Sequence, residues 1–173
     1  MIRAFIERRI AASERALGVE QAYLRHMLRV SRPAFFAFAR VRSFGEYRKH
    51  LPIEPWHVSR IVATAAEDCG TCVQIAVNLA LAAGVDPAIV RATVEGRVEA
   101  LPSDLADVYR FTEAVVRPTW DEGALRDALT VRYGEAAMVE MAIGIAAVRV
   151  FPIVKRALGF AVSCQKVRVE VPG

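Results

Sequence analysis

The first 32 residues place apolar side chains at helical spacing among charged ones. Those apolar residues, with Arg and Glu between them, are Ile2, Ile6, Ile10, Leu17, Leu24 and Leu28. The spacing predicts an amphipathic helix of up to about seven turns. Gly18 is its weak point, and Arg32-Pro33 ends or redirects it. We therefore expect a basic amphipathic arm over residues 1–32 and a helical domain over residues 33–173.

Helical spacing continues through that domain. It predicts helices over residues 34–40, 56–66, 69–83, 87–95, 103–116, 121–129 and 135–160, the last kinked at Pro152. Gly84 should stop the third of these helices, Asp86-Pro87 should cap and begin the next, and Ser103 should cap another. Only residues 167–171 alternate charged and apolar positions, which predicts a short strand. Because strands do not alternate with helices, the expected fold class is all-α.

The apolar share of the chain, 54% of 173 residues, allows a large core and buried subunit contacts. Residues 69–85 are uncharged but contain Gln74 and Asn78, and residues 135–162 are interrupted by charges and Pro152. We expect both stretches to be central helices of a helical protein rather than membrane spans. The odd cysteine count and the charged N-terminal residues predict a cytoplasmic protein without a secretory signal.

Basic residues concentrate in the first part of the chain. Residues 1–50 hold 11 Lys and Arg against 4 Glu, whereas residues 51–173 hold 12 against 15 Asp and Glu. Such a balance is compatible with contact to an anionic membrane surface or to nucleic acid. No zinc-finger or RNP-type sequence supports nucleic acid as a partner, so a solvated helix face next to acids of another subunit is the preferred interpretation.

Two of the three cysteines, Cys69 and Cys72, stand at C-x-x-C spacing where a helix is expected to begin. This spacing is typical of a redox pair or of half a metal site, and a helix N-terminus favours thiolate. The neighbouring carboxylates of Glu67 and Asp68 oppose thiolate formation. No second Cys pair is present to complete a structural zinc site, so we expect neither metal nor cofactor. Two buried, inert thiols are the remaining alternative.

Residues 50–97 resemble the carboxymuconolactone decarboxylase/alkylhydroperoxidase D family. The resemblance rests on an apolar helix before C-x-x-C, on Ala82-Ala83-Gly84-Val85 and on Asp86-Pro87. The segment from Leu101-Pro102-Ser103-Asp104 through Lys155-Arg156-Ala157-Leu158-Gly159 is similar to the helical second half of such proteins. The resemblance implies an all-α, multi-helix bundle that assembles as a homo-oligomer, and it extends over about residues 33–162.

The redox members of that family carry a Glu twelve residues before the first Cys and a His four residues after the second, and these two form a proton relay. The matching positions here are His57 and Ala76. The resemblance therefore transfers the cysteine roles, with Cys72 attacking peroxide and Cys69 resolving, but not the relay. Chemistry alone also allows the reverse order. An imidazole at His57 can exchange a proton near neutral pH, which makes it the third candidate catalytic residue; a surface histidine is the alternative.

Other polar residues in apolar stretches call for partners. Gln74 and Asn78 share one helix face and should form interhelical hydrogen bonds or line a pocket. Arg149 needs an anionic partner, which we expect to be a carboxylate of Glu140, Asp68 or a second subunit, or an anion bound at the site; a position at an interface rim is the alternative. Cys164 is expected to be a lone structural thiol.

The sequence thus predicts a thiol-dependent, peroxiredoxin-type oxidoreductase acting on a peroxide or a small disulfide, with a dithiol reductant as its second partner. Two other classes remain open. One is a non-catalytic helical oligomer or binding module that uses the basic arm. The other is a carboxymuconolactone decarboxylase-like enzyme without thiol chemistry.

Overall fold

The computed structural model describes residues 2–117, 122–160 and 171, and every regular element in these ranges is a helix. The all-α prediction is therefore confirmed. The elements are α1 (Ile2–Leu17), α2 (Ala22–Val30), α3 (Arg32–Gly45), α4 (Ile53–Ala65), α5 (Gly70–Ala82), α6 (Pro87–Glu95), the short 3-10 helix η1 (Val98–Ala100), α7 (Ser103–Val116), α8 (Glu122–Tyr133) and α9 (Glu135–Ala157).

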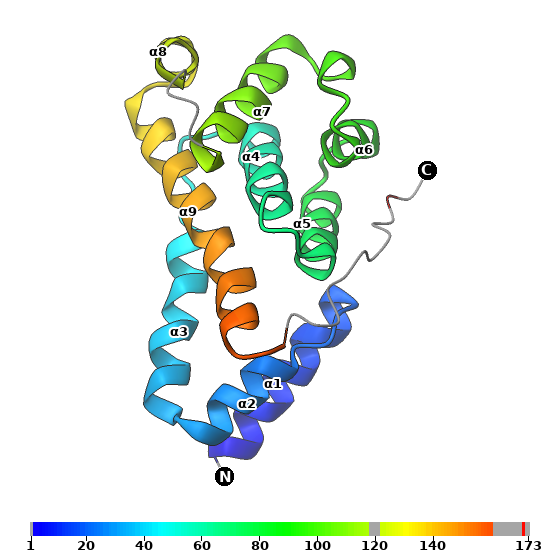
Figure 1. Ribbon diagram of the computed structural model, residues 1–173, viewed down its shortest axis with the longest axis vertical. Helices are drawn as coiled ribbons and strands as arrows, with labels where there is room; N and C mark the ends of the chain where they lie inside the picture. The colour runs from blue at the N-terminus through cyan, green and yellow to red at the C-terminus, as the bar shows by residue number, and fades with distance from the viewer. Residues whose placement is uncertain (1, 118–121, 161–170, 172–173) are drawn as a thin grey trace.

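Helix α4 is the centre of the molecule. It packs against α9, α7, α5 and α6, and most of its residues are buried (Figure 1). The main core lies between α4, α7 and α9 and includes Val58, Leu105, Val108, Met141 and Ile145. A second apolar cluster joins α5 and α6 to the other side of α4, through Ile61, Val77 and Val90 among others. The helix that leads to the cysteines is thus held on several sides.

Two glycines permit close helix packing around α9. A Cβ at Gly144 would lie 2.8 Å from the ring of Trp56 on α4, and a Cβ at Gly45 would lie 2.6 Å from the Cβ of Ala147. Both positions therefore need a residue without a side chain, because a close-packed interior cannot accept an extra methyl group without a shift of the helices. Gly144 and Gly45 therefore set the approach of α9 to α4 and of α3 to α9.

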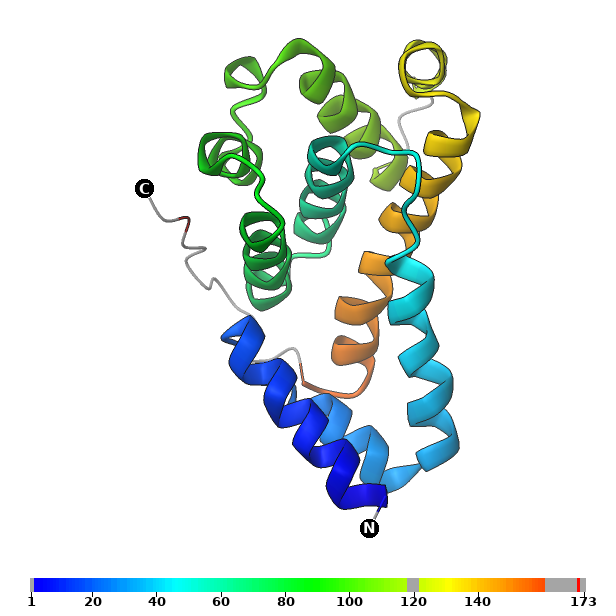
Figure 2. The same ribbon diagram turned by 180° about the vertical axis from the view of Figure 1, so that it is seen from behind.

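The predicted seven-turn N-terminal helix is wrong in its length, because the chain breaks at Gly18. Gly18 adopts a φ of +64°, which favours glycine, and the chain turns back so that α1 and α2 pack together (Figure 2). Glu14 fixes this turn by accepting hydrogen bonds from the Gln21 N–H at 2.7 Å and from the Arg25 guanidinium. Ile6, Ile10, Leu28 and Phe35 form a small core of their own.

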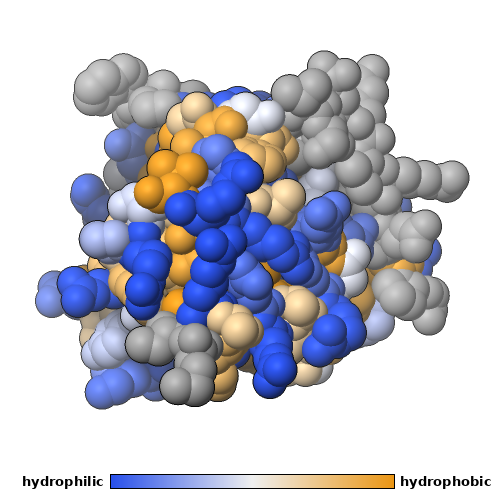
Figure 3. Space-filling view, turned by 90° about the horizontal axis from the view of Figure 1, so that it is seen from below, coloured by the Kyte–Doolittle hydropathy of each residue, from blue (hydrophilic) through white to orange (hydrophobic). Residues whose placement is uncertain are grey.

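The α1–α2 hairpin lies against the rest of the molecule. The Asn78 side chain on α5 donates to the Leu17 carbonyl at 2.9 Å, and α2 packs on α3. Figure 3 views this end of the molecule, where hydrophilic side chains run across the surface between smaller apolar areas. The basic residues of the first part of the chain therefore lie on a folded surface.

Several local predictions are confirmed and others change at their boundaries. Asp86 caps α6, with its Oδ1 accepting from the Ala88 N–H at 2.8 Å, and Gly84 follows α5 with a φ of +86°. Helices α3 and α8 are longer than predicted. Helix α3 begins earlier because the Ser31 side chain caps it by accepting from the Ala34 N–H. Ser103 does not cap α7; Pro102 precedes it without a side-chain hydrogen bond. Of the predicted strand, residues 167–170 lie outside the described residues.

Helix α9 is long and apolar enough to cross a membrane by length and composition alone. The core helix of a soluble protein passes the same test, and here α9 packs against α3, α4 and α8.

Candidate active site around Cys69 and Cys72

A tight turn between α4 and α5 presents the two cysteines. Asp68 has a φ of +50°, a left-handed conformation that aspartate tolerates better than most residues. The Asp68 N–H donates to the Ala65 carbonyl at 3.1 Å, and Cys69 is the N-cap residue of α5. The turn therefore places one sulfur at the start of the helix and the other within its first turn.

The two sulfurs face each other. Cys69 Sγ lies 2.8 Å from Cys72 Sγ, and the two are thiols that no disulfide joins. A disulfide needs a separation of about 2.05 Å, so a shift of less than about 1 Å would close the bond. Cys69 is 3% exposed and Cys72 is 8% exposed. The sequence-predicted pair is thus brought together in a buried position.

Lys155, on the last part of α9, reaches the same site. Its Nζ donates to Cys69 Sγ at 3.9 Å, and the side chain is buried. An ammonium close to a sulfur favours the thiolate form. Lys155 was not predicted as a site residue, because it lies far from the cysteines along the chain. Its only signal was a charged residue within a long, largely apolar helix.

Glu67, which precedes the turn, is neutralised by two arginines. Arg149 Nε and Arg156 Nη2 each donate to its carboxylate at 2.7 Å, and Arg156 Nη1 donates to its carbonyl. Burial alone would raise the pKa of Glu67, but the hydrogen bonds from Arg156 and Arg149 outweigh it and lower the pKa. The carboxylate is therefore held charged and compensated, which reduces its expected opposition to thiolate.

The two residues predicted as partners of Arg149 were wrong. Arg149 pairs with the carboxylate of Glu67 rather than with that of Glu140 or Asp68. Glu140 instead accepts backbone N–H groups of the loop before α4. Periodicity places Arg149 in a buried stretch, but it does not say which helix end lies opposite.

A pocket of about 150 Å³ opens beside Cys72. Cys72 and Lys155 belong to its wall, together with Tyr23 from α2, whereas Cys69 does not. Apolar side chains make up much of the rest, among them Ile75, Leu79, Val148 and Phe151. A molecule in this pocket would meet Cys72 first.

Tyr23 keeps its proton at neutral pH. Burial raises the pKa of its hydroxyl, and the negative charge of Cys72 and Cys69 raises it further. A protonated phenol next to sulfur can donate a hydrogen bond to a thiolate. Tyr23 is therefore a second site residue that the sequence did not suggest.

His57 lies buried on α4, and it is not among the residues that line this pocket. Burial, followed by the positive charges of Arg60 and Arg48, lowers its pKa to about 4. The imidazole is therefore neutral at pH 7. Its relay role stays a prediction.

The other polar residues and the third cysteine that the sequence singled out have different outcomes. Gln74 Nε2 donates to Asn78 Oδ1 at 2.9 Å, and Asn78 bonds to Leu17 on α1, which confirms an interhelical role for Asn78. Cys164 lies outside the described residues. Within the described part of the chain, no group of three or more His, Cys, Asp or Glu side chains is arranged to hold a metal ion.

Comparison of the chain with protein-family models, with curated proteins and with solved structures finds no match.

Proposed function

We propose that this protein is a thiol-dependent oxidoreductase of the alkylhydroperoxidase D-like type, in which Cys72 attacks and Cys69 resolves. The observation that carries the proposal is the 2.8 Å contact between the two sulfurs beside a pocket that reaches Cys72. The greater exposure of Cys72 supports the assignment of the two roles. Inert structural thiols would need neither a pocket nor a buried ammonium beside them.

The reaction with a peroxide would run in two steps. The Cys72 thiolate attacks one peroxide oxygen, the O–O bond breaks, and the leaving alkoxide or hydroxide takes up a proton. Cys72 is then a sulfenic acid. The Cys69 sulfur attacks it, the S–S bond forms and water leaves, carrying the hydroxyl group and one proton. A dithiol reductant restores both thiols by two thiol–disulfide exchanges and itself becomes a disulfide.

In this proposal, Lys155 stabilises the thiolate electrostatically. The redox members of the resembled family instead use the proton relay of a Glu and a His, which this chain lacks. With the ammonium at 3.9 Å from Cys69 Sγ, the reduced pair is favoured as a monoanion whose charge the two sulfurs share. Cys69 S–H donates to the Cys72 sulfur, and Cys72 belongs to the pocket wall. Formation of the disulfide removes this anion from beside Lys155.

The same proposal includes a homo-oligomeric assembly in the cytoplasm. Exposed apolar side chains on α3 and α9, such as Phe36, Phe44, Val139 and Ile153, offer surface for contacts between copies. Reduced, closely spaced thiols suit a compartment that keeps cysteines reduced.

Thiol trapping by mass spectrometry tests the proposal. The reduced protein is treated with one equivalent of hydrogen peroxide, and free thiols are then alkylated before digestion. We expect a Cys69–Cys72 disulfide in the treated sample, and alkylation of both Cys69 and Cys72 in the untreated one. Alkylation of both Cys69 and Cys72 after treatment would overturn the proposal.

Cys72→Ser and Cys69→Ser serve as matched variants for the order of attack. Cys69→Ser should accumulate a sulfenic acid at Cys72, detectable with a dimedone probe. Cys72→Ser should react slowly, because Cys69 lies outside the pocket wall. The reverse pattern would exchange the two roles.

A further inference from the structure

Arg60 on α4 brings a second positive charge to the pocket beside Cys72. Its guanidinium lies over the ring of Trp56, 4.8 Å from the centroid, and its Nη1 donates to the Gly45 carbonyl at 2.6 Å. The backbone carbonyl of Arg60 also accepts the Thr64 hydroxyl at 2.7 Å. Stacking and one hydrogen bond fix the orientation of the guanidinium and leave most of its N–H donors for another group.

Arg60 has no ion pair with a carboxylate among the residues that the structure describes. Burial lowers its pKa, and the charge of Glu46 offsets only part of that effect. Removal of a guanidinium from water is costly unless an anion compensates for it. The pocket wall therefore contains a positive charge whose compensation within the described chain is incomplete.

The other charged residues of the pocket wall already have partners or are exposed. Arg42 pairs with Glu46 at 2.7 Å, and both are largely exposed. Glu20 is exposed as well. Lys155 contacts Cys69 Sγ. Arg60 is thus the charge best placed to receive an anionic group from a molecule inside the pocket.

The size of the pocket limits that molecule. A cavity of about 150 Å³ can hold a benzene-sized body. Its apolar side chains, including Ile75, Leu79 and Phe151, suit a hydrocarbon group. Arg60 and Cys72 belong to the same wall, so one small molecule can reach both.

We propose that the pocket binds an apolar molecule of about six to eight carbons with one anionic head, preferably a carboxylate, which pairs with Arg60. The apolar body then lies along the pocket wall towards Cys72. The binding of such a molecule defines a substrate class only if the proposed redox function is correct. In that case the peroxide or disulfide that reacts at Cys72 is an anionic one. The binding itself rests on Arg60 and the pocket alone.

Benzoate and its neutral analogue benzamide test the proposal on the unmodified, reduced protein. Each is titrated by calorimetry, and each is then added during alkylation of Cys72 by iodoacetamide, a neutral reagent. We expect benzoate to bind and to slow Cys72 alkylation, and benzamide to bind about ten- to hundredfold more weakly. Equal affinity for the two, or no binding of benzoate at millimolar concentration, would overturn the proposal.

Variants of Arg60 assign the anionic contact. Arg60→Gln should weaken benzoate binding by about ten- to hundredfold and leave benzamide binding unchanged. Arg60→Lys should retain part of the preference, because it keeps the charge and loses the planar fork. Arg126→Gln on α8, an exposed arginine beside Asp127, is the matched control and should bind benzoate like the parent protein. Benzoate binding of parental affinity by a folded Arg60→Gln variant would show that Arg60 does not pair with the carboxylate.

If Arg60→Gln does not fold, the comparison of benzoate with benzamide in the parent protein still decides the matter. The outcome is also separate from that of the redox proposal. Benzoate binding without formation of a Cys69–Cys72 disulfide would support the anion-binding site and contradict the oxidoreductase proposal. Formation of the disulfide without benzoate binding would support the oxidoreductase proposal and contradict the anion-binding site.

Discussion

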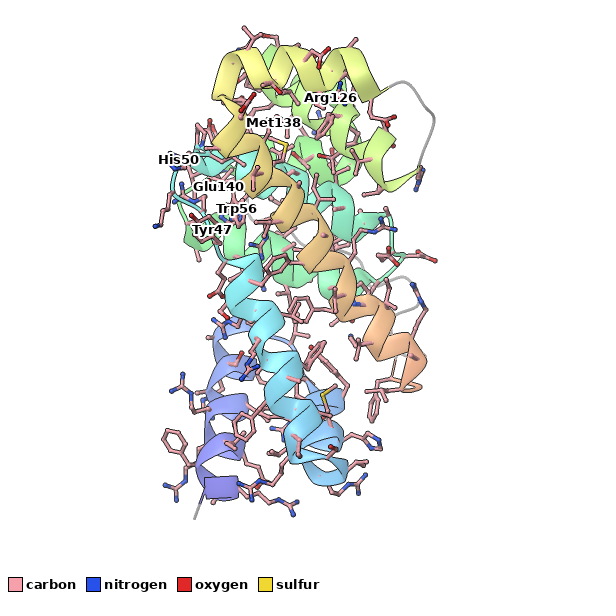
Figure 4. All side chains as sticks on the ribbon, turned by 90° about the vertical axis from the view of Figure 1, so that its left-hand side faces the viewer. Tyr47, His50, Trp56, Arg126, Met138 and Glu140 are labelled. Atoms are coloured by element: carbon pink, nitrogen blue, oxygen red, sulfur yellow. The ribbon has the colours of Figure 1, made fainter. Side chains whose placement is uncertain are left out.

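Helix α9 carries two buried charged residues, Glu140 and Lys155, that are compensated in different ways. Glu140 is 1% exposed and accepts the backbone N–H groups of Lys49 at 2.8 Å, His50 at 2.9 Å and Leu51 at 2.8 Å. Figure 4 places Glu140 beside His50 and Trp56, where α9 passes the loop before α4. These donors are fixed backbone groups, so the charge of Glu140 anchors the loop.

Lys155 is buried to a similar degree but contacts a sulfur and a cavity wall. The charge of that sulfur changes with its redox state, and the cavity can admit another molecule. Burial of a charge therefore does not by itself mark a chemical site. The nature of the compensating group does, since a peptide N–H cannot change during a reaction and a thiol can.

The largest expected effect of a mutation at these two residues is on stability, at Glu140. Glu140→Ala leaves several buried backbone N–H groups without acceptors and should lower the free energy of unfolding by about 3 kcal/mol or more. Urea unfolding followed by circular dichroism measures the loss. The thiols of the folded fraction should still form a disulfide with peroxide. Near-parental stability would contradict an anchoring role.

Gly144→Ala should disturb both ends of α9 together. The new Cβ would lie 2.8 Å from the rigid ring of Trp56, so α9 must shift against α4 at a cost of about 1–3 kcal/mol. Thermal unfolding should show the loss, and the rate of Cys72 alkylation should change with it. Ala142→Gly, at an exposed position of the same helix, controls for helix propensity.

Lys155→Met should spare the fold and alter the chemistry. Without the ammonium, thiolate absorbance at 240 nm should develop at higher pH, and Cys72 alkylation at pH 7 should slow by about tenfold, the equivalent of about 1.4 kcal/mol. Lys155→Arg should restore most of the rate. Identical thiolate titrations in Lys155→Met and the parent would show that Lys155 does not stabilise the thiolate and, like Glu140, has only a structural role.

Acid should weaken the anchor at Glu140. Burial would raise the pKa of Glu140, but the N–H groups of Leu51, His50 and Lys49 outweigh burial and lower the pKa. A carboxylate with a lowered folded-state pKa stabilises the fold above its unfolded value of about 4.3, and this contribution is lost as pH falls through the folded value. The stability difference between the parent and Glu140→Gln should therefore narrow from pH 7 to pH 3. A constant difference would rule out this linkage.

His57 should affect stability in acid but not at neutral pH. Its folded-state pKa of about 4 lies below the unfolded value of about 6.5, so the unfolded chain binds the proton more readily between these values. Stability should fall as pH drops from 6.5 towards 4, and less so in His57→Gln. The relay hypothesis further requires His57→Ala to slow Cys72 alkylation at pH 7; an unchanged rate would dismiss it.

Local signals allowed much of the fold to be predicted. The cap at Asp86, the stop at Gly84 and the helix that carries the cysteines follow from backbone preferences within a few residues. The break at Gly18 was visible only as a weak point, because an apolar period continues across it. The turn is held by contacts that the period does not show, namely the hydrogen bonds of Glu14 with Gln21 and Arg25 and that of Asn78 with the Leu17 carbonyl.

The site was only half predictable for the same reason. Cys69 and Cys72 are neighbours in sequence, so spacing alone brought them together. Lys155, Tyr23 and Arg60 join them from α9, α2 and α4, and helical periodicity does not say which faces of separate helices meet. The pairing of Arg149 with Glu67 could not be chosen from sequence among several carboxylates.

The reversal at Gly18 makes the first helices a wall of the cysteine pocket. Leu17, Gln21 and Tyr23 all line it. A shortened chain starting at Arg32 would keep both thiols and the ammonium beside them, yet the sulfurs would be open to glutathione and other bulky thiols. In the full chain, the α1–α2 hairpin therefore limits the size of the molecules that can reach Cys72 through the pocket.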